Sequence, residues 1–167
     1  NPGDVVIEQA GGGTADTVRS SISYSLQGSP QVENLELQGA AFAGAGNELA
    51  NSITGTAGVN ILAGLGDNDT LNGLAGNDTL IGGDGTDVAV FSGNRSNYTL
   101  TKNAAGDVTV VGTDGTDLVQ QVETLRFADQ DVAVAGITAP AVPATQGPDT
   151  LTGTAGADTI DGLGGAD

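Results

Sequence analysis

Aspartate and asparagine recur at every ninth position in the middle of this sequence, and a glycine stands five residues before each of them. The repeat is visible when residues 46–90 are written in lines of nine: GNELANSIT, GTAGVNILA, GLGDNDTLN, GLAGNDTLI and GGDGTDVAV. The sixth positions of these lines are Asn51, Asn60, Asp69, Asp78 and Asp87. Carboxylate and amide oxygens held at a fixed spacing are ligands suited to a hard cation.

The same nine-residue frame appears in three other places. Residues 144–167 read ATQGPDTLT, GTAGADTID and GLGGAD, which places Asp149, Asp158 and Asp167 at the sixth position. Residues 11–19 fit the frame with Asp16, and residues 112–120 fit it with Asp117. Repetition at a fixed period is typical of architectures in which similar units stack on one another.

The elements that position these oxygens are expected to be short β-strands. Nine residues are about 2.5 helical turns, so a helix would send the apolar eighth position to alternating faces. Six residues make a glycine-rich loop and three make a strand whose central side chain points inward. Two lines then complete one coil, so that residues 18 apart stack at about 4.8 Å. The sequence therefore predicts an all-β fold, a right-handed parallel β-roll flanked by strand and hairpin segments.

Stacking brings like charges together, because Asp69 lies over Asp87 and Asn60 over Asp78 in this arrangement. Two carboxylates about 5 Å apart repel by roughly 3 kcal/mol at an effective dielectric constant near 20. A cation between the loops would remove that repulsion. Ca²⁺ accepts 6–8 oxygen ligands in flexible geometry, whereas Mg²⁺ demands stricter octahedral placement. Calcium is therefore the expected ligand.

Composition excludes several other functions. The chain has no His or Cys, so zinc, haem and iron–sulfur sites and a Cys–His or Ser–His–Asp catalytic set are not expected. A net charge of −17 opposes binding to nucleic acid. No apolar run approaches the roughly 20 residues needed to cross a bilayer. We expect no enzyme in this chain, no nucleic-acid partner and no membrane insertion.

The tandem lines resemble the RTX (repeats-in-toxin) family of hemolysin-type calcium-binding repeats, and residues 73–81 and 82–90 are the best matches. The strings around VENLELQG and VETLRFADQ are similar to segments that border such arrays. In the family, one loop supplies the carbonyls of positions two and four and the side chain of position six. The next loop on the same side supplies the carbonyls of positions one and three and its own sixth-position carboxylate.

The resemblance implies three ligand sets. The first combines Leu65, Asp67 and Asp69 with Gly82, Asp84 and Asp87. The second combines Thr56, Gly58 and Asn60 with Gly73, Ala75 and Asp78. The third combines Thr145, Gly147 and Asp149 with Gly162, Gly164 and Asp167, and Asp158 is the sixth-position residue of the line between them. Sites that use Asn51 or Asn60 are expected to be weaker, and Asp78 is expected to lack a matching loop one turn later because residues 91–96 read FSGNRS.

Five segments are expected along the chain. They are an N-terminal β segment over 1–45 that continues or caps the roll, the roll itself over 46–90, a flanking β segment over 91–134, a proline-containing linker over 135–146, and the start of a second array over 147–167. Strands are predicted over 4–8, 17–26 and 32–37, a hairpin over 97–111, and a further strand over 119–127.

Some acidic residues remain open to two interpretations. Asp16, Asp114 and Asp117 are either turn residues or further calcium ligands. The stacked asparagines are either structural or ligating. Glu33 and Glu123 recur in the similar strings VENL and VETL, and the sequence gives them no clear role.

The predicted function is a calcium-binding RTX module that is part of a larger polypeptide and folds on binding Ca²⁺ outside the cell. The resemblance implies a secreted, extracellular or cell-surface location and export by a type I secretion system of a Gram-negative bacterium. Two alternatives remain. One is a structural surface component, such as an adhesin stalk or a surface-layer unit that contacts neighbouring copies. The other is a carbohydrate-binding module of a polysaccharide-active exoenzyme, with surface glycans as its partners.

Overall fold

The computed structural model describes residue 13 and residues 15–139, which form two seven-stranded sheets. The first sheet has the order β1 (Thr17–Ser20), β3 (Asn34–Leu37), β5 (Ser52–Thr54), β7 (Thr70–Asn72), β9 (Val88–Val90), β13 (Thr124–Arg126) and β14 (Asp131–Ala133). The second sheet has the order β10 (Thr99–Lys102), β11 (Val108–Gly112), β12 (Gly115–Gln120), β8 (Thr79–Asp84), β6 (Ile61–Gly66), β4 (Ala43–Ala45) and β2 (Tyr24–Ser25). Short 3-10 helices occupy η1 (Leu26–Gly28), η2 (Arg95–Asn97) and η3 (Val134–Gly136).

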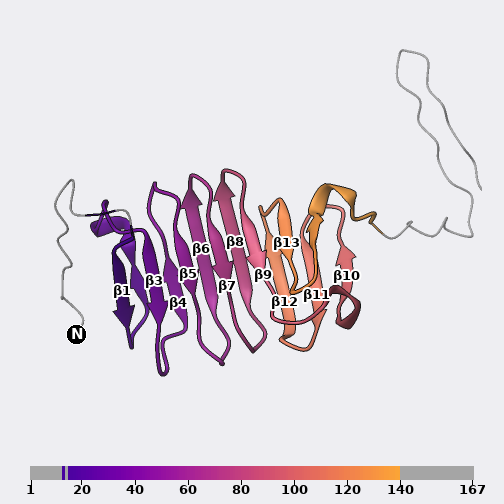
Figure 1. Ribbon diagram of the computed structural model, residues 1–167, viewed down its shortest axis with the longest axis horizontal. Helices are drawn as coiled ribbons and strands as arrows, with labels where there is room; N and C mark the ends of the chain where they lie inside the picture. Colours follow the sequence, from indigo (N-terminus) through magenta and orange to yellow (C-terminus); the bar gives the residue numbers. More distant parts are fainter. Residues whose placement is uncertain (1–12, 14, 140–167) are drawn as a thin grey trace, which may run out of the picture.

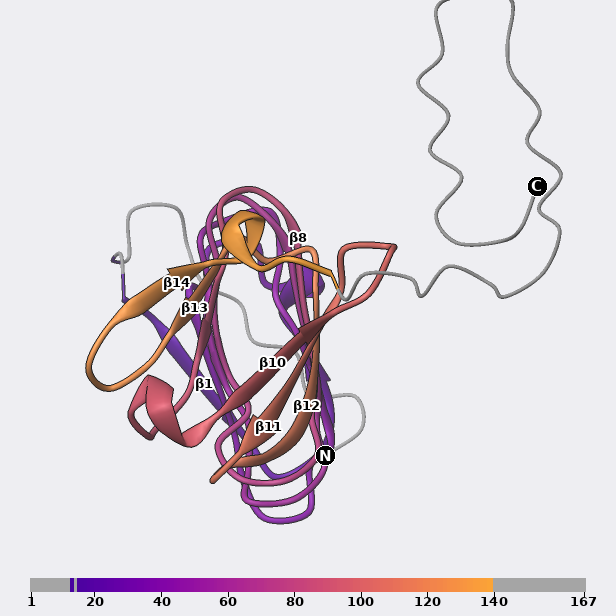
Figure 2. The ribbon, with the colours of Figure 1, turned by 90° about the vertical axis from the view of Figure 1, so that its right-hand side faces the viewer.

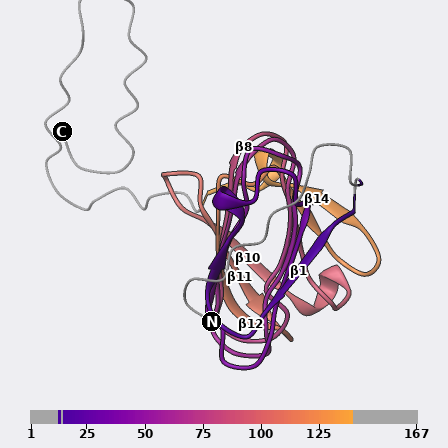
Figure 3. The ribbon, with the colours of Figure 1, turned by 90° about the vertical axis from the view of Figure 1, so that its left-hand side faces the viewer.

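From β1 to β9 consecutive strands alternate between the two sheets, so this part of the chain winds as a flattened coil. Figure 1 shows the strands side by side along the long axis, and Figures 2 and 3 show the coils superimposed when viewed along it. Leu62 pairs with Leu80 in the second sheet, and Thr70 pairs with Val88 in the first, both in parallel register. Each partner lies 18 residues further along the chain, which is two lines of the repeat. The structure thus confirms the parallel β-roll.

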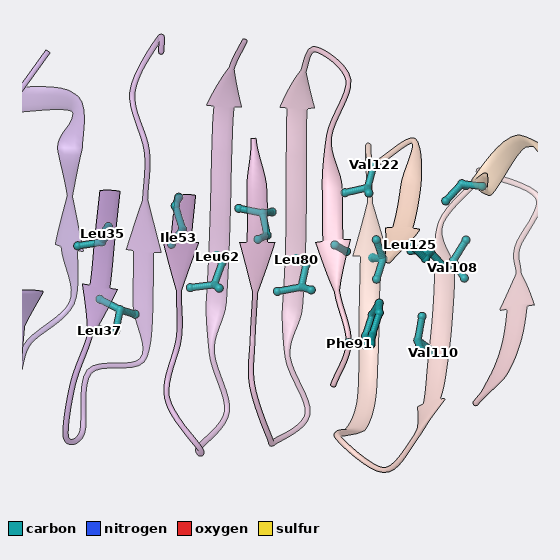
Figure 4. Packing of buried hydrophobic residues seen from close by; sticks show 14 of the residues in the cluster. Leu35, Leu37, Ile53, Leu62, Leu80, Phe91, Val108, Val110, Val122 and Leu125 are labelled. Atoms are coloured by element: carbon teal, nitrogen blue, oxygen red, sulfur yellow. The ribbon is translucent and has the colours of Figure 1, made fainter. Parts of the chain in front are cut away.

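The core is a double row of side chains between the sheets. The eighth-position residues Ile53, Leu62, Leu71 and Leu80 are all buried, and Figure 4 shows Ile53, Leu62 and Leu80 among the side chains packed in the core. Burying one such side chain contributes roughly 1.5–3 kcal/mol. Because the neighbouring strand residues face outward, this row supplies most of the apolar contact that holds one coil on the next.

Two of the predicted strands are divided between the sheets. Residues 17–26 form β1 in the first sheet and β2 in the second, and residues 119–127 include the end of β12 and all of β13. The chain turns at Ile22, whose backbone N–H donates to Oγ of Ser20 and whose carbonyl accepts from the same hydroxyl. A coil this narrow must cross between the sheets after every few residues, which is why no strand extends over nine or ten residues.

An insertion separates β9 from β12. Strands β10 and β11 form an antiparallel hairpin, as predicted over 97–111, and β12 then returns to pair in parallel with β8. The rings of Phe91, Tyr98 and Phe127 pack together, with centroids 5.0–5.6 Å apart, and all three are buried. This aromatic cluster lies where the insertion meets the last coil and extends the apolar core toward the C-terminal side.

Several predictions fall outside the described residues. These are the strand over 4–8, most of the linker with Thr145, and the second array over 147–167, which includes Gly147, Asp149, Asp158, Gly162, Gly164 and Asp167.

Candidate calcium sites

The polar repeat residues lie on loops at the two edges of the roll. Loops 46–51, 64–69 and 82–87 lead from the second sheet to the first, and we call this side the first edge. Loops 55–60 and 73–78 lead from the first sheet back to the second, and we call that side the second edge. Figure 2 shows these loops as the two ends of the flattened coil. Residues 18 apart therefore meet at the same edge.

Each sixth-position side chain reaches back to the preceding loop on its edge. On the first edge the backbone N–H of Asn51 donates to Oδ1 of Asp69 at 2.7 Å, and that of Asp69 donates to Oδ1 of Asp87 at 2.8 Å. On the second edge the backbone N–H of Asn60 donates to Oδ1 of Asp78 at 2.8 Å. The predicted stacking of Asp69 with Asp87, and of Asn60 with Asp78, is what the structure shows.

The loops keep a left-handed backbone even where the repeat has lost its glycines. Leu65, Asp67 and Leu74 have φ values of 91°, 64° and 70°. This conformation costs roughly 1–2 kcal/mol for a residue with a side chain. The side chains that replace glycine therefore do not change the path of the loop.

Close approach of neighbouring loops requires glycine at two positions of loop 82–87. A Cβ on Gly83 would lie 2.2 Å from the carbonyl oxygen of Leu65, and a Cβ on Gly85 would lie 2.1 Å from that of Asp67. The carbonyls of positions two and four therefore point at the next loop. These are the two carbonyls that the first predicted ligand set draws from loop 64–69.

The carboxylates of the first edge are buried, and only some of their oxygens accept a hydrogen bond. Asp69 is 1% exposed and Asp87 is fully buried, and Oδ2 of each is buried with no hydrogen-bond partner. Burial raises the pKa of Asp69 to about 7, the hydrogen bond from Asn51 opposes that rise, and the charges of Asp87 and Asp67 add to it. Burial likewise raises the pKa of Asp87. Partnerless carboxylate oxygens on loops whose carbonyls point at the next loop fit a divalent cation.

The second edge has the same arrangement with less charge. The carbonyl oxygen of Gly58 lies 2.6 Å from the position of a Cβ on Gly76. Burial raises the pKa of Asp78 to about 6. The side-chain amide of Asn60 donates to the carbonyl of Ala41 and to Oγ1 of Thr56. With one carboxylate in place of two, this set attracts a cation less strongly than the set on the first edge.

Carboxylates alone do not make these sites. Within residues 13 and 15–139, no group of three or more His, Cys, Asp and Glu side chains is placed to hold a metal ion. Each set instead brings together one sixth-position side chain from each of two loops, and carbonyl oxygens must complete the shell.

No helix among the described residues is long and apolar enough to cross a membrane.

The expectation that loop 73–78 has no partner one turn later was wrong. The backbone N–H of Asp78 donates to Oδ1 of Asp117 at 2.8 Å, and Leu80 pairs with Val119. Asp117 lies 39 residues after Asp78, whereas loops within the repeat lie 18 residues apart. The difference arises because the insertion after β9 separates the repeat from the next segment that follows the nine-residue pattern. The signal was present in the sequence, since residues 112–120 fit the nine-residue pattern.

Two glutamates occupy the place of the sixth-position aspartate. Oε2 of Glu123 accepts from the backbone N–H of Asp87 at 2.7 Å, and Oε2 of Glu33 accepts from that of Asp16 at 3.0 Å. Ile81 pairs with Gln120 and Val88 with Thr124, so the three residues 121–123 face the six of loop 82–87. A longer side chain is needed to reach across so short a turn. The recurrence of VENL and VETL was the signal for this shared role.

Asp114 accepts hydrogen bonds from other residues of the insertion after β9. Its carboxylate accepts from the hydroxyl and backbone N–H of Ser92 and from the hydroxyl of Tyr98. These hydrogen bonds from Ser92 and Tyr98 lower the pKa of Asp114 although burial opposes them. Its carboxylate oxygens are therefore occupied by protein donors.

Comparison with known proteins agrees with this geometry. A family model of the RTX calcium-binding nonapeptide repeat (4 copies) matches residues 54–89 and residues 144–167. No curated protein and no solved structure matches the chain at a significant level. RTX nonapeptide repeats bind Ca²⁺. This chain carries RTX calcium-binding nonapeptide repeats and folds over residues 54–89 into the parallel β-roll of such repeats.

Proposed function

We propose that this chain is a calcium-dependent folding module within a larger secreted bacterial protein. The observation that carries the proposal is the pair of buried carboxylates at Asp69 and Asp87, each with a partnerless Oδ2. Their mutual repulsion and their loss of hydration both oppose the folded state. When bound, Ca²⁺ supplies the positive charge that offsets both terms.

The residues of the first edge provide a complete ligand set. Carbonyls of Leu65 and Asp67 with the carboxylate of Asp69 come from one loop. Carbonyls of Gly82 and Asp84 with the carboxylate of Asp87 come from the next. Six oxygens with two negative charges meet the lower end of the coordination number that Ca²⁺ prefers. The second edge provides a weaker set from Thr56, Gly58 and Asn60 with Gly73, Ala75 and Asp78.

Binding and folding are coupled because the ligands come from separate coils. Asp69 and Asp87 lie 18 residues apart and meet only when β7 pairs with β9. Metal affinity of a site that exists only in the folded chain adds to folding stability. At tenfold excess of Ca²⁺ over the dissociation constant, each site contributes about 1.4 kcal/mol. Several sites together are enough to decide whether a small roll folds.

The coupling of folding to calcium binding is suited to secretion from the cell. The repeat is typical of secreted bacterial proteins. Cytosolic calcium is low, so we infer that the chain stays unfolded for passage through a type I secretion system and folds in extracellular calcium. Extracellular calcium modules commonly have dissociation constants of about 10⁻⁴–10⁻³ M.

Circular dichroism of the full chain tests the proposal. We expect the β-sheet signal to appear as Ca²⁺ is titrated to millimolar concentration, to disappear with EGTA, and to stay absent with Mg²⁺ at the same concentration. Spectra that are unchanged by EGTA would falsify calcium-dependent folding.

A structural surface component remains the second candidate. The family model matches a second stretch at residues 144–167, which favours an extended repeat protein. A glycan-binding role is less favoured, because Phe91, Tyr98 and Phe127 are buried and, within residues 13 and 15–139, Phe42 is the one aromatic side chain exposed enough to stack on a sugar ring. An enzymatic role is not proposed, because the buried aspartates on the two edges accept hydrogen bonds from backbone N–H groups of neighbouring loops. A glycan array tests whether the chain binds sugars. Sedimentation in Ca²⁺ tests whether copies of the chain associate, as a surface component would.

A further inference from the structure

The hairpin turn 112–117 takes the place of a further loop on the second edge. It joins β11 to β12, and Gly115 forms a parallel bridge with Gly76 of loop 73–78. The backbone N–H of Gly76 donates to the carbonyl of Asp114 at 2.7 Å. The turn lies outside the residues matched by the family model, which end at residue 89 in this part of the chain.

Contacts at this turn reproduce those between two repeat loops. On the first edge the backbone N–H of Thr86 donates to Oδ1 of Asn68 at 2.8 Å. At the hairpin turn the backbone N–H of Thr116 donates to Oδ1 of Asn77 at 2.9 Å. The carbonyl of Gly76 points at Gly115, where a Cβ would lie only 1.7 Å away. The fourth-position carbonyl therefore faces the hairpin turn as the carbonyl of Asp67 faces loop 82–87.

The carboxylates at this place lack a positive partner. Asp78 and Asp117 are each 3% exposed. Oδ1 of each accepts one backbone N–H, from Asn60 and Asp78 respectively. Among the hydrogen bonds of residues 13 and 15–139, none reaches Oδ2 of Asp78 or of Asp117, although these two atoms, unlike Oδ2 of Asp69 and of Asp87, are not fully buried. Two carboxylates that have lost most of their hydration destabilise the fold unless a cation compensates their charge.

No basic side chain is available to supply that charge. The chain has four Lys and Arg residues in all. Arg19 pairs with Glu36, and Arg126 pairs with Asp131. The head groups of Arg95 and Lys102 donate to the carbonyls of Tyr98 and Val134. The negative charge of Asp78 and Asp117 can therefore be compensated only from outside the chain.

We propose that loop 73–78 and the hairpin turn 112–117 form an additional Ca²⁺ site, with the carboxylates of Asp78 and Asp117 and the carbonyl of Gly76 as ligands. The proposal rests on the calcium-binding function proposed above and extends it to a segment outside the repeat match. The second edge then carries one site more than its repeats alone provide. On the first edge the three-residue turn 121–123 is too short to offer the carbonyls of a six-residue loop. Ca²⁺ at the hairpin turn ties the insertion to the array.

Terbium luminescence can report on this site alone. Tb³⁺ occupies calcium sites and emits strongly when a nearby tyrosine absorbs light. The chain has two tyrosines and no tryptophan. The hydroxyl of Tyr98 donates to Oδ2 of Asp114 at 2.6 Å, three residues from Asp117. Tyr24 lies on β2, four strands from β12 in the sheet order. A Tyr24→Phe background therefore leaves Tyr98 as the sole tyrosine sensitiser.

The experiment compares three variants of the full chain in that background. In Asp117→Asn the amide oxygen still accepts the N–H of Asp78, but the negative charge is lost. We expect it to lose most of the Tyr98-sensitised Tb³⁺ emission and one equivalent of Ca²⁺ by calorimetry. Asp107→Asn removes the same charge from an exposed turn of the insertion and should change neither. Asp117→Glu restores a carboxylate and should restore emission.

Each outcome decides the proposal. Emission and Ca²⁺ stoichiometry unchanged in Asp117→Asn overturn it, as does emission lost in both Asp117 variants. If Asp87→Asn still loses one equivalent while Asp117→Asn loses none, the hairpin site is absent and the calcium-binding function stands. If the unsubstituted chain binds no Ca²⁺, both proposals fall together.

Discussion

The backbone N–H of Asp69 donates to Oδ1 of Asp87 across 2.8 Å, and Oδ2 of the same Asp87 carboxylate is buried with no partner. One oxygen thus fixes the register between two coils while the other is left for a ligand from outside the chain. The same division recurs at Asp69, whose Oδ1 accepts from Asn51 and whose Oδ2 is partnerless. In the proposed site, the structural role and the calcium-binding role of the sixth position therefore belong to different atoms of one side chain.

Removing this carboxylate should weaken calcium binding more than removing a neighbouring amide. We expect Asp87→Ala or Asp69→Ala to lower affinity at the first-edge site at least tenfold, which corresponds to about 1.4 kcal/mol. Asn51→Ala should have a smaller effect, because Asn51 brings no charge to a site. Calorimetric titration with Ca²⁺ measures all three. Equal affinities in the three variants would contradict the ranking of the sites.

Acidity should stabilise the calcium-free fold. The pKa of Asp69 is raised to about 7 and that of Asp78 to about 6, mainly by burial. Between the ordinary pKa near 4 and these values the folded state binds more protons than the unfolded state, so stability falls as pH rises from about 4 to about 7. Without calcium, the folded fraction measured by the β-sheet signal in circular dichroism should therefore be larger at pH 5 than at pH 7.5.

Saturating calcium should reverse this dependence. Calcium ligands must be deprotonated, so Ca²⁺ competes with protons at Asp69 and Asp78. We expect Ca²⁺ affinity to rise from pH 5 to pH 7.5 and binding at pH 6 to release protons, which calorimetry in buffers of different ionisation enthalpy detects. A calcium-free β-sheet signal that rises with pH would show that these carboxylates are not held protonated.

The sequence alone predicted the parts of the fold that depend on local spacing. Leu62 pairs with Leu80, and Asp69 meets Asp87, because both follow from a period of nine. Asp117 was not assigned to Asp78, because the length of an insertion does not reveal where the frame resumes. Glu123 was not assigned either, because its role depends on a turn shortened to three residues opposite a six-residue loop. The sequence thus did not reveal which loops that are distant along the chain lie next to each other in the roll.

Truncation of the core row should unfold the roll more readily than truncation of its surface. Leu71→Ala removes a fully buried side chain from the centre of the first sheet and should lower the free energy of unfolding by about 2–5 kcal/mol. Val59→Ala removes a side chain that is 63% exposed and serves as the control, with an effect within about 0.5 kcal/mol. Denaturant unfolding in saturating Ca²⁺ measures both. Similar values for the two variants would mean that the eighth position is not the core.

Part of the first edge is held by amides, and its stability should be independent of calcium. The side-chain amide of Asn47 donates to the carbonyls of Ser29 and Val32 at 3.0 and 2.9 Å, which joins loop 46–51 to the preceding coil. Asn47 is buried, so truncating it leaves both carbonyls without this donor. We expect Asn47→Ala to lower the free energy of unfolding by about 1–3 kcal/mol equally in Ca²⁺ at pH 7.5 and in EGTA at pH 5. The matched variant Asp87→Asn, which keeps the acceptor for Asp69, should lose stability only in Ca²⁺. If the effect of Asn47→Ala were instead confined to calcium, this amide would be supporting a metal site and not a metal-free contact between coils.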